Sequence, residues 1–252
     1  MTASTSRDQM WDVKRKDGTS VETSDGWTIA HKGETLTMRP TVQDATVVFG
    51  CGWDPVPGRK MDVDIALVLL GEDGEMLCDY GIVDYQTMKH PTGTAWLTGD
   101  NRDGEGDGDD EQIVVLLDRL PVHVRALVFM MNIYEGGMLG DVQNGHLRLF
   151  VPEAATRPGV VSRKLLHYDV SDLAQESPYE NGAFMCRLER APIGAGGYEE
   201  FVNEAWTVEP VFEPFTAGNC CAAVEASRYN NPAVHWREAV PKSGTQEGCV
   251  LI

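Results

Sequence analysis

The chain has 252 residues, of which 39 are acidic and 21 are Lys or Arg, so its formal net charge is −18. Because contact with a nucleic-acid backbone needs Lys and Arg, this charge argues against a nucleic-acid partner. The hydrophobic content of 42% is enough for a sizeable core, either in one β-sandwich with tails or in two small domains.

The expected elements are mostly short strands. Residues up to about 25 are polar and predict a mobile N-terminal arm. Short apolar or alternating runs separated by Gly, Pro and Asp follow, which is typical of an antiparallel sandwich or barrel. The expected strands are 34–38, 45–49, 63–70, 76–83, 94–97, 113–117, 125–134, 145–151, 163–170, 183–189 and 205–212. A short helical turn is expected at 118–123, and the periodicity ends beyond residue 216.

These patterns predict an all-β protein. We expect an antiparallel β-sandwich with one or two short helices at residues 26–215. An irregular arm at residues 1–25 would precede it, and an irregular tail at residues 216–252 would follow it.

The segment GDNRDGEGDGDDE, from Gly99 to Glu111, is the most informative part of the chain. Its seven acids repel one another at neutral pH, so a folded loop requires a compensating cation. Hard oxygen ligands in a flexible loop suit calcium better than magnesium. A solvated linker is the alternative for this composition, but strand-like segments pin both ends of the loop. The candidate ligands are Asp100, Asn101, Gly104, Glu105, Asp107, Asp109, Asp110 and Glu111.

Two familiar calcium loops do not fit this segment. An EF-hand that starts at Asp103 would have Val114 where a bidentate Glu is required. The nonapeptide repeats of calcium β-helices also fail, because GEGDGD occurs once and no period recurs.

A pair of acids upstream is a second source of ligands. Because side chains on a strand alternate between its two faces, Asp62 and Asp64 are expected on one face and Val63 and Ile65 in the core. Two adjacent carboxylates on one face are costly alone and useful around a divalent cation. A polar strand face turned to water is the alternative interpretation.

The strings TGDNRDGEGDGDDEQI and GWDPVPGRKMDVDIALVLLGEDG resemble the signature of the TerD family of tellurium-resistance and stress-response proteins. The resemblance runs from about Glu34 to about Phe212. It implies a β-sandwich that binds one or two calcium ions through the acidic loop and the Asp-x-Asp strand. Two family motifs are altered to Val-Asp-Tyr and Ile-Tyr-Glu, which makes Asp84 and Glu135 candidate ligands of a second site.

Catalytic motifs are not found in the sequence. The six histidines are scattered, and no nucleophile elbow, phosphate loop or His-Glu-x-x-His occurs. This favours a calcium-binding scaffold or sensor over an enzyme, with other stress-response proteins as partners. The alternatives are a hydrolase that uses metal-activated water, or a binder of cyclic nucleotides or phospholipid headgroups. The last would need basic residues near the metal, and Arg102 is the only one in the loop. Trp53 is expected to be a core aromatic.

The chain ends Cys249-Val250-Leu251-Ile252, which has the form of a prenylation box. Chance is the alternative explanation of such a tetrad. Since one lipid chain anchors a protein only marginally, the tail predicts a lipoprotein that associates reversibly with the cytoplasmic face of membranes. Cys220 and Cys221 are either palmitoylation sites or core residues.

The remaining compositional signals indicate a cytoplasmic protein. The N-terminus lacks an apolar signal segment, and no apolar run reaches the ~18 residues that a membrane span needs. The cysteines show no Cys-x-x-Cys pair, and we expect reduced thiols.

Overall fold

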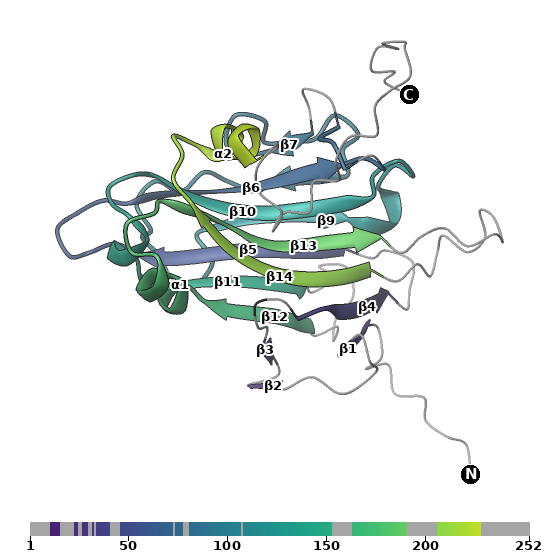
Figure 1. The fold of residues 1–252 in the computed structure, drawn as a ribbon, viewed down its shortest axis with the longest axis horizontal. Coiled ribbons are helices and arrows are strands. Elements are labelled where there is room, and N and C mark those ends of the chain that lie inside the picture. Colours follow the sequence, from purple (N-terminus) through teal and green to yellow (C-terminus); the bar gives the residue numbers. More distant parts are fainter. Residues whose placement is uncertain are drawn as a thin grey trace.

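The computed structural model describes residues 11–15, 23–24, 27–29, 32, 34–40, 46–72, 74–77, 81–106, 108–152, 163–190 and 206–227. These residues form two seven-stranded sheets (Figure 1). The first has the order β1 (Trp11–Arg15), β4 (Leu36–Pro40), β14 (Trp206–Phe215), β13 (Gly182–Arg190), β10 (Ala126–Glu135), β6 (Asp62–Leu70), β7 (Ile82–Val83). The second has the order β2 (Thr23–Ser24), β3 (Trp27–Ile29), β12 (Arg163–Asp169), β11 (Gln143–Val151), β5 (Thr46–Asp54), β9 (Glu111–Leu116), β8 (Ala95–Leu97).

The strand pairing is antiparallel among the described residues except between β12 and β3, which are parallel. The helices described are short: α1 (Val170–Glu176), α2 (Cys220–Ser227) and the 3₁₀ turns η2 (Leu117–Arg119) and η3 (Leu139–Asp141). The expected all-β sandwich with one or two short helices is confirmed. None of the described helices has the length and apolar character needed to cross a bilayer.

Strand β6 is buried on both of its faces. Val63 and Ile65 lie in the main core between the sheets, together with Phe49 of β5 and Phe129 of β10. The opposite face of β6 contributes to a second cluster with residues of α2, which is seen beside β6 and β7 in Figure 1. Burial on both faces explains the nearly continuous apolar run of β6, since each buried aliphatic side chain contributes about 1.5–3 kcal/mol to stability. The run is interrupted at its start by Asp62 and Asp64.

The structure differs from the sequence expectations at the two ends of the chain. Within the expected N-terminal arm, β1 pairs with β4 and β2 pairs with β3. Within the expected C-terminal tail, α2 begins after Asn219, whose side chain accepts a hydrogen bond from Ala222 N–H at 2.8 Å. Cys220, Ala223 and Val224 recur at helical spacing and pack on the first sheet. A helix this short leaves too little periodicity to recognise in the sequence.

Smaller differences concern element boundaries. Of the strand expected at 76–83, the described residues form β7 at its end and an isolated bridge between Met76 and Leu70. The helix α1 begins at Val170 because Asp169 caps it, accepting a hydrogen bond from Ser171 N–H at 2.8 Å. The helical turn expected at 118–123 forms as η2. Trp53 is 3% exposed and donates its indole N–H to the Met61 carbonyl, so its expected core position is confirmed.

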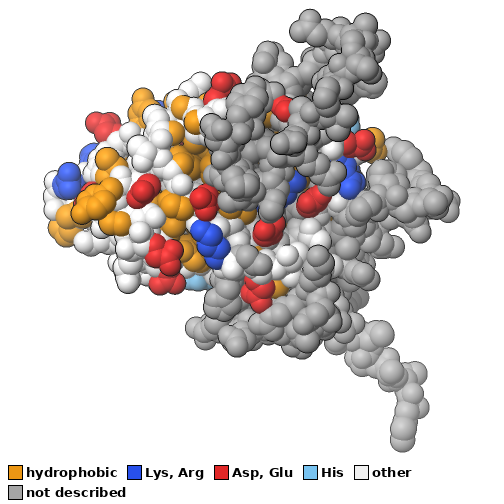
Figure 2. Space-filling view, viewed as in Figure 1, with side chains coloured by type: hydrophobic (Ala, Val, Ile, Leu, Met, Phe, Trp, Pro, Cys, Tyr) orange, Lys and Arg blue, Asp and Glu red, His pale blue; other side chains and the backbone are white. Residues whose placement is uncertain are grey.

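Acidic and basic side chains are dispersed over the described part of the face shown in Figure 2. The net charge of the chain is therefore not gathered into one patch on that face. Acidic side chains converge instead at the N-terminal end of β6, where Asp100 of the acidic loop lies near Asp62 and Asp64.

Candidate metal centre

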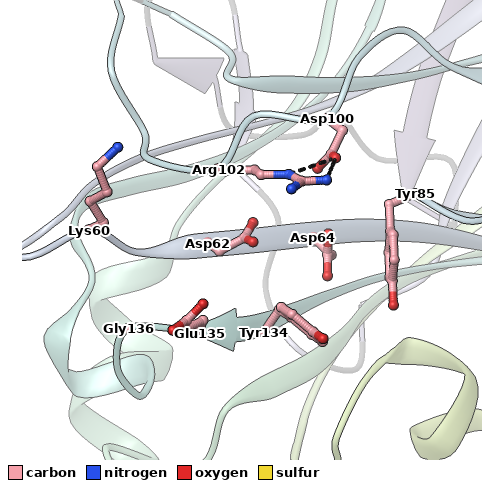
Figure 3. Close-up of a pocket in the computed structure, with 9 residues that line it drawn as sticks. All are labelled: Lys60, Asp62, Asp64, Tyr85, Asp100, Arg102, Tyr134, Glu135 and Gly136. Atoms are coloured by element: carbon pink, nitrogen blue, oxygen red, sulfur yellow. Dashed lines mark hydrogen bonds and ion pairs between the residues drawn. The ribbon is translucent and has the colours of Figure 1, made fainter.

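Three carboxylates converge beside the first residues of β6. Asp62 and Asp64 project from the same face of that strand, and Asp100 comes from the loop between β8 and β9. One oxygen of each carboxylate lies within 4.8 Å of the others. Figure 3 shows Asp100 on one side of β6 and Glu135 of β10 on the other.

These acids line a cavity of about 500 Å³. Its other lining residues come from segments far apart in the sequence and include cations and aromatic rings. The full set is Lys60, Asp62, Asp64, Tyr85, Asp100, Arg102, Tyr134, Glu135 and Gly136 (Figure 3).

The electrostatics of the acidic trio favour a cation. Asp64 is 5% exposed, and burial, followed by the charges of Asp62 and Asp100, raises its pKa to about 7. Burial and the charge of Asp100 also raise the pKa of Asp62. The Oδ1 atom of Asp62 is buried without a hydrogen-bond partner among the described residues. A buried, unpaired carboxylate oxygen is costly, and a hard divalent cation would remove that cost.

Two basic side chains partly balance the acids. Arg102 donates from Nε and Nη2 to Asp100 Oδ2, at 3.1 and 2.8 Å. Lys60 Nζ lies 3.2 Å from Asp103 Oδ2. Both basic side chains are largely exposed, so they are held by their partners and not by packing.

Glu111 ties the acidic loop to the first sheet. Its Oε2 accepts a hydrogen bond from Ile65 N–H at 3.0 Å, and its Oε1 accepts one from Asn101 N–H at 3.1 Å. The residue is 1% exposed, and burial raises its pKa to about 8 despite these two donors. Since Glu111 begins β9 of the second sheet and bonds to Ile65 of β6, it connects the two sheets next to Asp64 in the chain.

Asp110 holds the loop against β5. Its Oδ2 accepts from Trp53 N–H at 2.9 Å, and its Oδ1 accepts from Asn101 Nδ2 at 3.1 Å. Asn101 in turn accepts from the N–H groups of Asp103 and Gly104 at 3.0 and 2.9 Å, which closes a turn. Gly104 has φ +65°, a conformation that favours glycine, and a Cβ there would collide with the Trp53 ring.

The Asp109 side chain is held by hydrogen bonds on the outer face of the second sheet. Arg148 Nε donates to its Oδ1 at 2.8 Å, His146 Nε2 lies 3.1 Å away, and Gln112 donates to Oδ2 at 3.0 Å. Burial alone would raise the pKa of Asp109, but the hydrogen bonds from His146 and Arg148 and the charge of Arg148 outweigh it and lower the pKa. The carboxylate lies directly over Gly50 of β5, where any Cβ would collide with it.

The structure therefore sorts the candidate ligands into two groups. It brings together Asp62, Asp64 and Asp100, with Glu135 in the same cavity. It gives other partners to Asn101, Asp109, Asp110 and Glu111, whose polar atoms hold the loop in place. Gly104 serves the turn, Glu105 is exposed, and Asp107 lies outside the described residues.

The candidate second site is divided between two places. Asp84 is 3% exposed, and its Oδ1 accepts from the N–H groups of Gln86 and Thr87 at 2.9 and 2.8 Å, so it organises a turn. Glu135 lies opposite Asp62 in the β6–β10 register. Sequence reasoning did not find Lys60, Tyr85 or Tyr134 as site residues. The signal for Tyr85 and Tyr134 was their place in the two altered family motifs, Val-Asp-Tyr and Ile-Tyr-Glu, next to Asp84 and Glu135.

Comparison with known proteins identifies the family. The family model described as the TerD domain matches residues 29–191. The chain is 30% identical to the uncharacterized protein YceE of Bacillus subtilis (strain 168) over 167 residues, covering 63% of this chain and 82% of that protein. It is 33% identical to the tellurium resistance protein TerX of Serratia marcescens over 147 residues, covering 46% and 69%.

A solved structure has the same fold. It is a homologue of the telluride resistance protein TerD from Streptomyces coelicolor A3(2), with a TM-score of 0.50 at 19% identity, covering 69% of this chain and 90% of that one. Because the family model matches more than half of the sequence, this protein belongs to the TerD family of tellurium-resistance and stress-response proteins.

Proposed function

We propose that the protein binds a calcium ion through Asp62, Asp64 and Asp100 and acts as a non-enzymatic binding module in stress response. The observation that carries this proposal is the buried Asp62 Oδ1, which has no hydrogen-bond partner among the described residues and faces two further carboxylates. Calcium accepts oxygen ligands at variable angles, which suits carboxylates supplied by a strand and a loop. Glu135 lines the same cavity and would be a further ligand of this ion or of a second one.

Strand β6 and the acidic loop would position the three carboxylates for the ion. Asp62 and Asp64 are held at fixed spacing by the pleat of β6, and Asp100 is positioned by the loop that Glu111 and Asp110 tie down. A bound ion would cross-link the loop and the first sheet by electrostatic attraction. The proposed activity is therefore a calcium-dependent stiffening of one end of the sandwich, to which stress-response partners would respond.

The test is a calorimetric calcium titration of the whole chain, with magnesium titrated in parallel. Asp62→Asn and Asp64→Asn are expected to weaken calcium binding by more than about tenfold, since each removes an ionic ligand. Asp172→Asn, at an exposed acid in the first turn of α1, is the matched control and should change little. Equal, small effects at all three positions would mean that the acids act as diffuse charge, and the proposal would fail.

We also propose reversible attachment to the cytoplasmic face of membranes through a prenylated Cys249. The sequence of the last four residues carries this proposal, and they lie outside the described residues. Burial of Cys220, at 3% exposure on the sheet side of α2, favours a core role for that thiol over palmitoylation. Intact-mass analysis of protein from a eukaryotic host tests the modification directly.

A further inference from the structure

The cavity beside the acidic trio is much larger than an ion requires. Its volume of about 500 Å³ falls within the roughly 300–1,000 Å³ range of small-molecule sites, whereas a water molecule occupies only about 30 Å³. Two aromatic rings stand at its wall, with the Tyr85 and Tyr134 centroids 6.0 Å apart and the planes at 50°. Tyr134 is 53% exposed, so a large part of its ring is accessible at the end of β10.

Calcium held by the trio would have coordination positions open toward this cavity. Calcium takes roughly six to eight oxygens, so three carboxylates that each give one oxygen leave at least about three positions unfilled. The nearby acids Asp109, Asp110 and Glu111 are engaged with protein donors and do not fill them. Glu135, which lines the same cavity, would supply one of the missing oxygens, and the others must come from water or from a ligand in the cavity.

Once calcium is bound, the net charge of the lining would allow an anion to bind in the cavity. Four carboxylates and two cationic side chains line the cavity, so one calcium ion brings the formal charge of the lining to zero. Calcium at Asp100 would compete with Arg102 for that carboxylate. A released guanidinium presents a planar set of donors that matches phosphoryl oxygens.

The aromatic wall offers a further donor. The Tyr85 hydroxyl accepts a hydrogen bond from Gln86 Nε2 at 2.8 Å, which leaves its own O–H free to donate into the cavity. Tyr134 provides an exposed apolar surface beside it. A ligand that fits this wall has an anionic end and an apolar or aromatic body.

From these features we infer that the cavity binds a phosphate monoester, whose oxygens bridge the calcium ion and Arg102 while its organic part packs against Tyr85 and Tyr134. A phosphoryl group suits this position because its three acceptor oxygens reach a metal and a guanidinium at the same time. The inference rests on the proposed calcium site. The monoester would be either a free metabolite or the headgroup of a lipid.

The test titrates phenyl phosphate into the whole chain, produced in bacteria, with saturating calcium or with EDTA. Binding is expected only with calcium. Arg102→Gln should weaken phenyl phosphate binding at least tenfold and tighten calcium binding, because it removes a cation that competes at Asp100. Tyr134→Ala should weaken binding of phenyl phosphate more than binding of inorganic phosphate. Arg59→Gln, at an exposed arginine that is not part of the lining, is the matched control and should change neither.

The outcomes separate the two proposals. Failure of calcium itself to bind removes the proposed function. Calcium binding without calcium-dependent phenyl phosphate binding, or an unchanged affinity in Arg102→Gln, overturns the inference alone. Vesicles that contain phosphatidic acid identify the source: sedimentation with calcium that phenyl phosphate reverses assigns a lipid headgroup, and no sedimentation assigns a soluble monoester.

Discussion

Calcium binding should depend on pH through Asp64. Burial and the neighbouring acids raise the pKa of this carboxyl to about 7, so the metal-free protein holds a proton there at pH 6 and has lost it at pH 8. Calcium must displace that proton. With a pKa of about 7, the protonated fraction falls from about nine-tenths at pH 6 to about one-tenth at pH 8. Apparent affinity should therefore rise about tenfold over this interval, which is about 1.4 kcal/mol.

The raised pKa of Asp64 also determines whether the stability of the metal-free protein rises or falls with pH. A carboxyl with a raised folded-state pKa contributes stability that is present below its unfolded value and is lost as pH rises through the folded value. For Asp64 that window extends from its ordinary pKa of 3.8 to about 7, and Glu111, with a pKa of about 8, acts in the same direction. The lowered pKa of Asp109 has the opposite effect on stability, but only below its ordinary pKa of 3.8. The metal-free protein should thus melt at a lower temperature at pH 8 than at pH 6, and calcium should stabilise it more at pH 8.

The assay is calcium titration by calorimetry at pH 6, 7 and 8 in two buffers with different ionisation enthalpies, which counts the protons released. About one proton should leave per calcium ion at pH 6, and only about one-tenth of a proton at pH 8. Asp64→Asn should bind calcium more weakly and with a smaller pH dependence. An affinity that is constant from pH 6 to pH 8, with no proton release at pH 6, would refute the reasoning.

Three further outcomes are expected. Gly50→Ala should lower the free energy of unfolding by about 1–3 kcal/mol in urea, because its Cβ collides with the Asp109 carboxylate, whereas Gly218→Ala, with open space around it, should change little. Arg148→Met should lower the free energy of unfolding by about 2 kcal/mol, because it leaves the Asp109 carboxylate without its charged donor. The calcium affinity measured by calorimetry should stay within about threefold of wild type. A tenfold loss of calcium affinity would mean that Asp109 is a ligand. In a eukaryotic cell, Cys249→Ser should move the membrane-bound fraction of the protein to the supernatant without changing calcium affinity, and identical fractionation of wild type and variant would exclude the anchor.

Several features follow from local sequence alone. Alternation of apolar and polar residues placed most strands within a few residues, because a strand's two faces repeat every second residue. The same period put Asp62 and Asp64 on one face of β6 and Val63 and Ile65 in the core, as the structure has them. The acidic loop was recognisable because seven acids and several glycines gain nothing from helix or strand.

Other features depend on contacts between distant segments and required the tertiary structure. The loop's acids look alike in the sequence, yet Asp100 faces the cavity while Asp109 is paired with Arg148 on the opposite sheet. That choice depends on the turn closed by Asn101 and on which strands lie beneath the loop. Lys60, Tyr85 and Tyr134 enter the same cavity from three separate segments, and no local pattern marks that meeting. Hydrophobic periodicity acts over neighbouring residues and so determined the strands, whereas the packing of two sheets against each other decided which polar side chains meet at their end.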